Sequence, residues 1–264
     1  MAMGIFFLIL SFALLALRSC ADPANFGYHG RYGPKKWGSL SPNFSACAKG
    51  KHQSPVDLRK ENIVYSKELK PLERHYHSSN ASLVHNGFNI GVHFDGKVGD
   101  LRTDGEVFYL KQMHWHSPSE HRFNGKQMEA ELHLVHQNEE GSFAVVSVLY
   151  KLGNPDTIIS KMEKKLVELA KESSAGYVGA HVDLGSFNVR HVKGRGQSYY
   201  RYMGSLTTPP CKENVTWTIL GELRSISLQQ LHLLKAPLSP QFKNNARPIQ
   251  PLDGRKILKY SGQA

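Results

Sequence analysis

Residues 105–116 read "GEVFYLKQMHWH", a run rich in aromatic and other large side chains that favours a β-strand. Side chains alternate between the two faces of a strand, so His114 and His116 share one face and Trp115 lies on the other. The chain continues with "SPSEH", which adds Glu120 and His121. The stretch therefore predicts a strand that ends in two histidines on one face, and these either bind a metal or belong to a polar surface.

Four other stretches have the composition of strands, with Gly and Asp in the gaps between them. They are "ASLVHNGFNIGVHF" (81–94), "AELHLVHQ" (130–137), "FAVVSVLYKL" (143–152) and "VTWTILGEL" (215–223). The second of these alternates apolar and polar residues, and the turn "NEEGS" joins it to the third, a continuous apolar run typical of a buried strand. The pattern predicts a mainly β (α+β) fold with a large, mostly antiparallel, twisted central sheet and a few short peripheral helices.

Two stretches predict helices. Asn154 followed by Pro155 makes an N-cap and a first helical residue. An apolar stripe at helical spacing then follows, made of Ile158, Ile159, Met162, Leu166 and Leu169. Ser227 and Gln230 form a capping box, which predicts a second, short helix through "QLHLLK".

The 264 residues contain no internal repeat and no low-complexity linker, so residues 22–264 are predicted to form one domain. Residues 1–21 are predicted to be a signal peptide. Their apolar run, 5–17, is too short to span a bilayer comfortably, and Ser19 and Ala21 supply small residues for cleavage after Ala21. No Lys or Arg precedes the run, so an uncleaved anchor is the alternative. No later stretch is apolar enough to span a membrane.

Cysteine usage fits export. Cleavage would remove Cys20 and leave Cys47 and Cys211, which predict one long-range disulfide in an oxidising compartment; two unrelated buried thiols are the alternative. Three Asn-x-Ser/Thr sequons predict glycan acceptors at Asn43, Asn80 and Asn214. The protein is therefore expected to be secreted to the apoplast or matrix. A plastid or another compartment reached through the secretory pathway is the alternative.

The net charge is +11 and the pI is near 9.5, which raises the question of an acidic partner. The basic residues are dispersed, and the densest runs, "RHVKGRG" and "KGRGQSYYRY", lack the spacing of a known nucleic-acid module. No nucleic-acid partner is predicted. A basic module that binds acidic cell-wall or matrix polymers is a weaker hypothesis, since it depends on charge alone.

The strand "AELHLVHQ" carries a third histidine. His133 shares its strand face with Glu131 and Val135, and a hairpin can bring it beside His114 and His116. Three neutral imidazoles leave the fourth tetrahedral position of a zinc ion for water, which is the arrangement of a catalytic site. The spacing therefore favours a zinc site over an exposed polar patch, although a His-x-His pair alone would not.

Gln112 lies two residues before His114, and Glu131 lies two residues before His133, each on the same face as its histidine. Metal-bound imidazoles usually donate their second N–H to such a group. Both side chains are therefore predicted to orient the ligands. A solvated strand carboxylate is the alternative for Glu131.

Six motifs together resemble an α-class carbonic anhydrase of the secreted branch, which includes plant members. They are "QSPVDL" (53–58), "MHWHSPSEH" (113–121), "AELHLVH" (130–136), "GSLTTPPC" (204–211), "VTW" (215–217) and "NNARPIQPL" (244–252). The resemblance covers nearly all of residues 22–264. It implies the family's fold, a zinc cofactor, reversible hydration of carbon dioxide to bicarbonate and a proton, and inhibition by sulfonamides and anions. It also implies a disulfide from the N-terminal segment to the loop after "TTPP".

The resemblance assigns the zinc ligands to His114, His116 and His133. It implies that the hydroxyl of Thr207 accepts a hydrogen bond from the zinc-bound hydroxide and donates one to Glu120. It further implies that Thr208 contacts bicarbonate. The apolar wall for the substrate would be Val135, Val145, Leu206, Val215 and Trp217, for which a plain core role is the alternative.

Tyr28 matches a tyrosine that orders water in the family's cavity, although Phe26 stands where the family often has Trp. His121 and His136 are predicted to be structural, since His136 lies three residues from His133 and so faces the other side of its strand.

Phe88 is the main departure from the family, because it occupies the position where members with fast proton release carry a histidine. Phenylalanine cannot relay a proton, so release is expected to be slower and more dependent on buffer. His93 shares a strand face with Asn89 and is the candidate substitute; His85 and His29 are weaker candidates. The missing shuttle also leaves an alternative function, that of a storage or binding protein that retains the fold with little activity.

Overall fold

The computed structural model describes residues 26–174, 179–192 and 198–262. The predicted signal peptide, residues 1–21, lies outside these ranges. The strands are β1 (Asp57–Leu58), β2 (Ile63–Tyr65), β3 (Glu73–Tyr76), β4 (Ser78–His85), β5 (Ile90–Phe94), β6 (Gly99–Thr103), β7 (Glu106–His116), β8 (Arg122–Phe123), β9 (Lys126–Gln127), β10 (Ala130–Gln137), β11 (Phe143–Leu152), β12 (His181–Asn188), β13 (Tyr199–Ser205), β14 (Glu213–Leu220), β15 (Arg224–Ile226) and β16 (Ile257–Tyr260). The α-helices are α1 (Trp37–Leu40), α2 (Ala46–Lys49), α3 (Thr157–Ser160), α4 (Glu163–Ser174) and α5 (Leu228–Lys235). The 3-10 helices are η1 (Gly30–Tyr32), η2 (Pro34–Lys36), η3 (Pro42–Phe44), η4 (Lys60–Asn62), η5 (Val189–Val192) and η6 (Pro240–Phe242).

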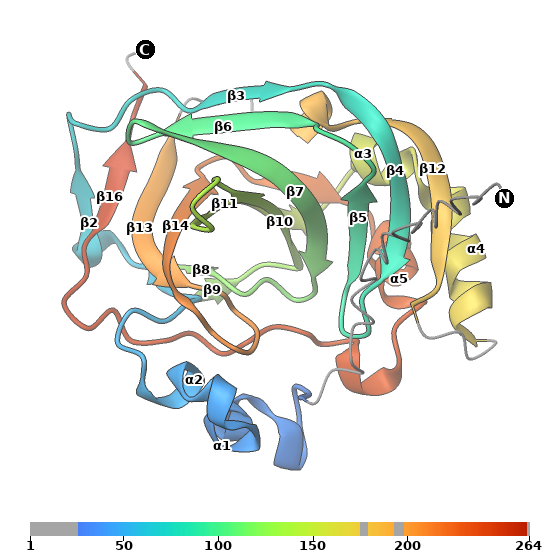
Figure 1. Ribbon diagram of the computed structural model, residues 1–264, viewed down its shortest axis with the longest axis horizontal. Coiled ribbons are helices and arrows are strands. Elements are labelled where there is room, and N and C mark those ends of the chain that lie inside the picture. Colours follow the sequence, from blue (N-terminus) through green and yellow to red (C-terminus); the bar gives the residue numbers. More distant parts are fainter. Residues whose placement is uncertain (1–25, 175–178, 193–197, 263–264) are drawn as a thin grey trace, which may run out of the picture.

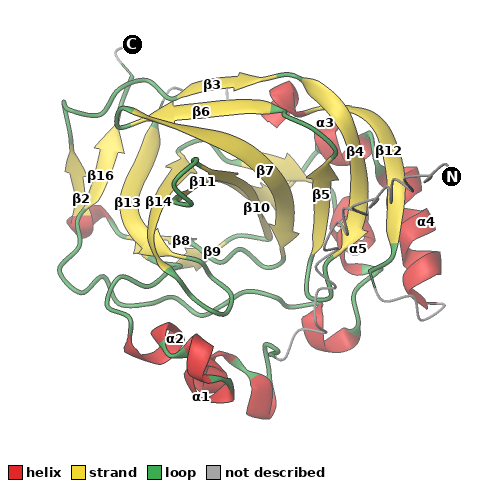
Figure 2. Ribbon diagram, viewed as in Figure 1, coloured by secondary structure: helices red, strands yellow, loops and turns green. Residues whose placement is uncertain are grey.

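Within the described residues, thirteen strands form one large twisted sheet, and its main path runs β12-β4-β5-β7-β10-β11-β14-β13-β16-β2 (Figures 1 and 2). Most neighbouring strands are antiparallel, and β11 with β14, β11 with β15, and β16 with β2 are parallel pairs. The short strands β1, β8 and β9 form a separate small sheet. The predicted fold class is confirmed: a mainly β domain with a few short helices around the sheet.

The β7–β10–β11 register brings the predicted histidine strands together. β7 and β10 are antiparallel, with His133 opposite His114 and Glu131 opposite His116. β10 and β11 have the bounds of the predicted strands 130–137 and 143–152, and they form the expected antiparallel pair. A bulge follows Val135, which pairs with Gln112, whereas His136 pairs with Leu110.

The two faces of the sheet carry two different apolar clusters. The helix-side cluster contains Leu132 and Leu134 of β10 together with buried side chains of α3, α4 and α5, such as Leu166. The site-side cluster contains Val135 and Trp217 from the opposite face. Because side chains alternate along β10, a single strand supplies both clusters. Helices therefore cover one face, and the other is left for the histidines.

The helix predicted after Asn154 differs from the structure. Its N-cap is Asp156, whose carboxylate accepts hydrogen bonds from the backbone N–H groups of Ile158 and Ile159, at 2.8 and 3.1 Å. The helix is also divided into α3 and α4. Arg224 pairs with Asp156 at 2.6 Å and thereby favours the cap at that carboxylate. The capping box of Ser227 and Gln230 at the start of α5 is confirmed.

The long-range disulfide is confirmed, since Cys47 of α2 is bonded to Cys211. All three sequon asparagines are exposed: Asn43, Asn80 and Asn214. Among the described residues, no helix is long and apolar enough to cross a membrane.

Candidate metal centre

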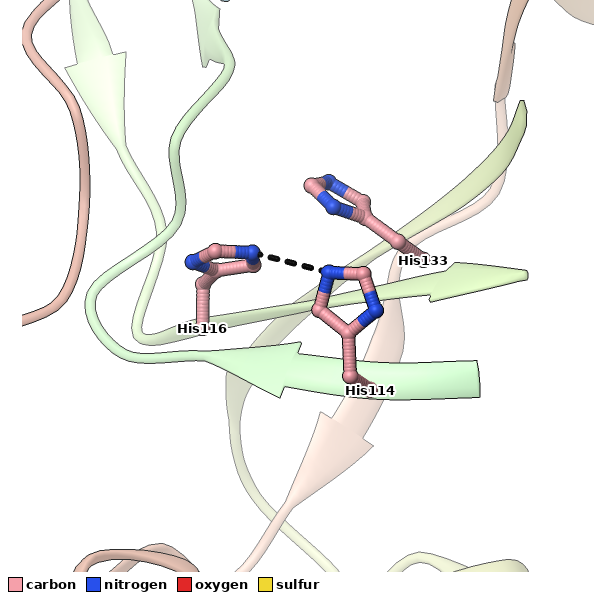
Figure 3. A group of neighbouring side chains, drawn as sticks. All are labelled: His114, His116 and His133. Atoms are coloured by element: carbon pink, nitrogen blue, oxygen red, sulfur yellow. Dashed lines mark hydrogen bonds between the residues drawn. The ribbon is translucent and has the colours of Figure 1, made fainter. Parts of the chain in front are cut away.

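Three imidazoles converge on one point at the end of β7 (Figure 3). His114 and His116 come from β7, and His133 comes from the neighbouring β10; each offers a ring nitrogen, and the three nitrogens lie within 4.8 Å of one another. Ring centroids are 4.8 to 5.2 Å apart. Gly91 of β5 pairs opposite His114, and a Cβ there would lie 2.7 Å from the Asn86 side chain.

Hydrogen bonds determine which nitrogen of each ring remains free. Nδ1 of His114 donates to Oε1 of Gln112 at 2.8 Å, and Nδ1 of His116 donates to the backbone carbonyl of Asn245 at 2.7 Å. On His133 it is Nε2 that is engaged, with Oε1 of Glu131 at 2.7 Å. The nitrogens left to face one another are therefore Nε2, Nε2 and Nδ1.

This donor set fits a zinc ion. Nε2 of His114 and Nε2 of His116 lie 3.1 Å apart, and in neutral rings whose Nδ1 atoms carry the protons both present lone pairs. Two nitrogens bound tetrahedrally at about 2.0–2.1 Å from zinc would be about 3.3 Å apart. Burial lowers the pKa of all three rings, which keeps them neutral, the form that binds a metal.

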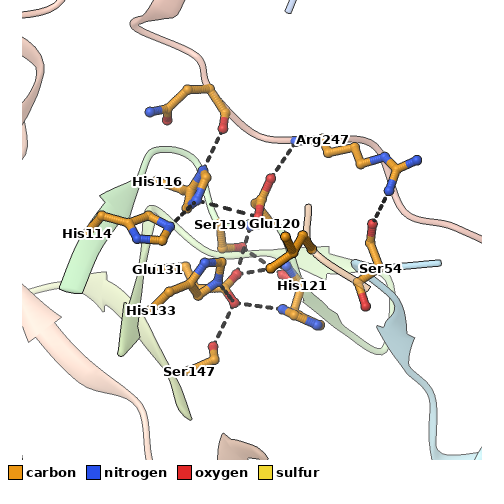
Figure 4. Close-up of polar contacts among 12 residues, drawn as sticks. Ser54, His114, His116, Ser119, Glu120, His121, Glu131, His133, Ser147 and Arg247 are labelled. Carbon is orange, nitrogen blue, oxygen red and sulfur yellow. Dashed lines mark hydrogen bonds and ion pairs between the residues drawn. The ribbon is translucent and has the colours of Figure 1, made fainter. Parts of the chain in front are cut away.

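The Glu131 carboxylate accepts hydrogen bonds from several groups around the histidines (Figure 4). Its Oε1 accepts from His133, from Nδ1 of His121 at 2.6 Å and from the hydroxyl of Ser147 at 2.6 Å. Its Oε2 accepts the backbone N–H groups of Glu120 and His121, both at 2.8 Å. Burial alone would raise the pKa of Glu131, but the neighbouring histidines and these donors hold it well below its usual range.

His121, Glu131 and His133 form a second group of potential metal donors. Their facing atoms are already joined by hydrogen bonds, and Nε2 of His121 lies 2.7 Å from the hydroxyl of Tyr202. Both nitrogens of the His121 ring are therefore engaged by protein groups. The structure thus places His121 as a support for the metal centre, in agreement with its predicted structural role.

Glu120 lies beside the histidines, and within the described part of the chain only one of its two carboxylate oxygens accepts a hydrogen bond. Its Oε1 accepts the backbone N–H of Arg247 at 2.9 Å, and its Oε2 lies 3.6 Å from Nε2 of His116. Oε2 has no hydrogen-bond partner among the described residues. Burial raises the pKa of Glu120 to about 7, whereas the nearby hydroxyl of Thr207 lowers it without reaching Oε2 at hydrogen-bond distance.

The loop that carries Thr207 is closed at both ends. The backbone N–H of Leu206 donates to the carbonyl of Lys212 at 2.9 Å, and that of Cys211 donates to the carbonyl of Thr208 at 2.8 Å. The disulfide then ties Cys211 to α2. Thr207 is buried, and Thr208 is half-buried.

Comparison with known proteins agrees with this geometry. The family profile described as eukaryotic-type carbonic anhydrase matches residues 32–261. The chain belongs to this family. It is 38% identical to alpha carbonic anhydrase 7 of Arabidopsis thaliana over 267 residues, which cover 97% of this chain and 95% of that protein.

Two solved structures extend the comparison. A dioscorin complexed with ascorbate has a TM-score of 0.85 at 33% identity, covering 90% of this chain and 98% of its own. The α-carbonic anhydrase of Thermovibrio ammonificans, complexed with the inhibitor sulfanilamide, has a TM-score of 0.79 at 35% identity, covering 90% and 100%. The plant-like resemblance found in the sequence is thus supported.

The side chains that the carbonic anhydrase resemblance assigns to the substrate wall lie together on the histidine face. Four of them are buried in the site-side cluster and the fifth packs against it: Val135, Val145, Val215, Trp217 and Leu206. The ring of Trp217 is 4.9 Å from that of His133, and its Nε1 donates to the carbonyl of Ser205 at 2.9 Å. Metal donors and an apolar surface are therefore adjacent.

Tyr28 and Phe88 belong to an aromatic group beside the centre. The hydroxyl of Tyr28 is buried without a hydrogen-bond partner among the described residues, and burial raises its pKa well above the usual value. Phe88 packs against Phe26 with ring centroids 5.1 Å apart, and its carbonyl accepts from Nδ2 of Asn245 at 2.8 Å. His93 is exposed and pairs opposite Gln112, on the strand face of His114.

Two contributors were not singled out from the sequence. Asn245 orients His116 through its carbonyl and accepts the backbone N–H of Ser117 at 2.9 Å. Arg247 holds Glu120 through its backbone, and its buried guanidinium donates to Gln53 and to the Cys47 carbonyl at 2.9 and 3.1 Å. The motif "NNARPIQPL" contains both residues, but no sequence rule indicates which of its backbone atoms contact His116 and Glu120.

Proposed function

We propose that this protein catalyses the zinc-dependent, reversible hydration of carbon dioxide to bicarbonate and a proton. The observation that carries the proposal is the convergence of three neutral imidazole nitrogens beside an apolar wall. His114, His116 and His133 would hold the zinc, and Gln112, Glu131 and the Asn245 carbonyl would fix the ring orientations. Zinc in such a site acts as a Lewis acid and lowers the pKa of its water to about 7, a value known from carbonic anhydrases themselves.

Thr207 and Glu120 would orient the attacking oxygen. A hydroxyl that donates to the open Oε2 of Glu120 has its lone pairs free to accept a hydrogen bond from the nucleophile. The Arg247 N–H fixes the other oxygen of the same carboxylate, so Glu120 stays an acceptor for Thr207. Thr208, at the surface of the loop, is proposed to contact bicarbonate, and Trp217 with its apolar neighbours would receive carbon dioxide.

Proton release is proposed to be the slow step. Phe88 offers no titratable atom, and His93 is the candidate substitute because it is exposed on the face of the metal ligands. Tyr28 would order water between the centre and solvent through its unpaired hydroxyl. External buffer would then accept much of the proton flux.

A storage or binding role with little activity is the second candidate, favoured by the similarity to dioscorin. The local chemistry weighs against it, because the three histidines, Glu120 and Thr207 are all present and assembled. The disulfide supports an oxidising compartment, and the exposed sequons are compatible with glycosylation. Secretion to the apoplast or matrix therefore remains part of the proposal.

One experiment separates the two candidates. The purified protein is analysed for zinc by elemental emission, and its carbon dioxide hydration rate is measured with and without a sulfonamide. We expect one zinc per chain and a rate that the sulfonamide abolishes. Correctly folded protein that holds no zinc when supplied with it, and that shows no hydration above background, would rule out the enzyme.

A further inference from the structure

A groove of about 390 Å³ follows β3 and is separate from the metal centre. The described residues that line it are Arg74, His75, Tyr76, His77 and Arg190, the last from η5. Tyr76 belongs to the helix-side cluster, on the opposite face of the sheet from His133. In Figure 1, β3 lies at the top of the molecule, whereas α1 and α2 lie at the bottom. The groove therefore has no part in the proposed hydration chemistry.

Both arginines line the groove, and neither has an acidic partner among the described residues. Nη1 of Arg74 donates to the carbonyl of Val192 at 3.4 Å, and Nε of Arg190 donates to the carbonyl of Tyr76 at 2.6 Å. Across the described ranges, neither guanidinium has a carboxylate oxygen within 4.0 Å. Each guanidinium has five N–H groups, so carbonyl contacts that orient it leave several donors unused.

The acid that contacts a lining residue, Asp100, does not neutralise the groove. Asp100, opposite His75 in the β3–β6 pairing, accepts from Nδ1 of His75 and from Nε of Arg102, both at 3.1 Å. Its charge is therefore already shared with Arg102. Arg74 is half-buried, and this burial lowers its pKa because it disfavours the charged form. An anion in the groove would offset that cost.

We propose that this groove binds the phosphoryl group of a small organic phosphate through Arg74 and Arg190. The planar fork of arginine matches the oxygens of a phosphoryl group, and two forks held by backbone carbonyls would present donors in fixed positions. His75 and His77 complete the lining, with their Nδ1 atoms engaged by Asp100 and by the carbonyl of Ser78. The groove is larger than a bare phosphate requires and falls in the size range of small-ligand sites, so the organic part of an ester has room.

The test uses the zinc-loaded protein with a sulfonamide present, which keeps phosphate away from the metal. Binding of inorganic phosphate and of a sugar phosphate is measured by calorimetry for the wild type and for Arg190→Gln and Arg74→Gln. We expect saturable binding, tighter for the ester, that weakens at least about tenfold in each variant, as expected for a lost charged hydrogen bond. Arg31→Gln removes an equal charge near α1 and is expected to change nothing.

Arg190 is exposed, so its variant tests the groove even if the half-buried Arg74 proves necessary for folding. Circular dichroism and the hydration rate check that each variant is folded, since neither arginine belongs to the metal centre. Wild-type protein that binds neither ligand overturns the proposal, and so does binding that both groove variants retain at full strength. Equal affinity for the two ligands would show that only the phosphoryl group is recognised and would overturn the assignment to an ester.

Discussion

His133 and His136 lie three residues apart on β10, on opposite faces of the sheet, and their ring nitrogens have different partners. On the site side, His133 uses one nitrogen to contact Glu131 and leaves the other facing two more imidazoles. On the helix side, His136 has both nitrogens engaged, one with the hydroxyl of Tyr76 at 2.7 Å and one with the carbonyl of Ala144 at 3.1 Å. Two histidines of one strand thus differ in role. His133 is a candidate ligand because one of its nitrogens is left open, and His136 is a structural group because neither of its nitrogens is.

The largest expected effect comes from removing the candidate ligand of this pair, His133. His133→Ala should lose stoichiometric zinc and reduce hydration to background, because two imidazoles cannot supply the third nitrogen donor. His136→Gln is the matched control and should keep one zinc per chain, measured by elemental emission. A folded His133→Ala protein that retains full zinc would contradict the assignment.

The next effect concerns the site side of the sheet and tests the orientation of the nucleophile rather than the binding of zinc. Thr207→Val keeps the loop's shape but removes the hydroxyl, and we expect kcat/KM for hydration to fall about 100-fold, as for the loss of one preorganised hydrogen bond. Zinc content should not change. Thr207→Ser should restore most of the rate, and full activity in Thr207→Val would show that Thr207 does not orient the nucleophile.

On the helix side of the sheet, the buried ring of His136 predicts that stability depends on pH. Burial lowers the pKa of His136 to about 4, against about 6.5 in an unfolded chain. Between these values only the unfolded chain binds the proton, so the free energy of unfolding should fall as pH drops from 6.5 to 4, by about 3 kcal/mol in total. Urea unfolding at several pH values measures this slope. His136→Gln should reduce this slope without removing it, because burial also lowers the pKa values of His114, His116 and His133. An unchanged slope would refute the assignment.

The smallest expected effect concerns the rim of the metal centre. Phe88→His should raise the hydration rate several-fold in dilute buffer and have no effect at high imidazole concentration, since external buffer then carries the proton. His93→Ala should lower the dilute-buffer rate of the wild type. An unchanged rate in Phe88→His would mean that proton transfer does not limit turnover, and an unchanged rate in His93→Ala would exclude His93 as the shuttle.

Local periodicity predicted the parts of this molecule that depend on one or two neighbouring strands. Alternation placed His114, His116 and His133 on one face, and the same two-residue spacing placed Gln112 and Glu131 beside them. It also separated His136 from the centre, because three residues along a strand reach the other face.

Contacts made by distant backbone atoms could not be predicted. The carbonyl of Asn245 reaches His116 across 129 residues, and the N–H of Arg247 reaches Glu120 across 127. Every residue has a backbone carbonyl and every residue except proline has an N–H, so side-chain patterns carry no signal for these contacts. The helix cap at Asp156 was missed for a related reason: local rules favour Asn154 before Pro155, whereas a partner 68 residues away, Arg224, engages the Asp156 carboxylate.

The Cys47–Cys211 bridge also has a consequence for the order of biosynthesis. Its two cysteines are 164 residues apart, so the ribosome must complete about four-fifths of the chain before the bond can form. At about 5–20 residues per second, Cys47 would wait on the order of ten to thirty seconds for its partner. All three histidines of the metal centre emerge during that interval. A chain that has formed this bond has therefore already presented every proposed zinc ligand.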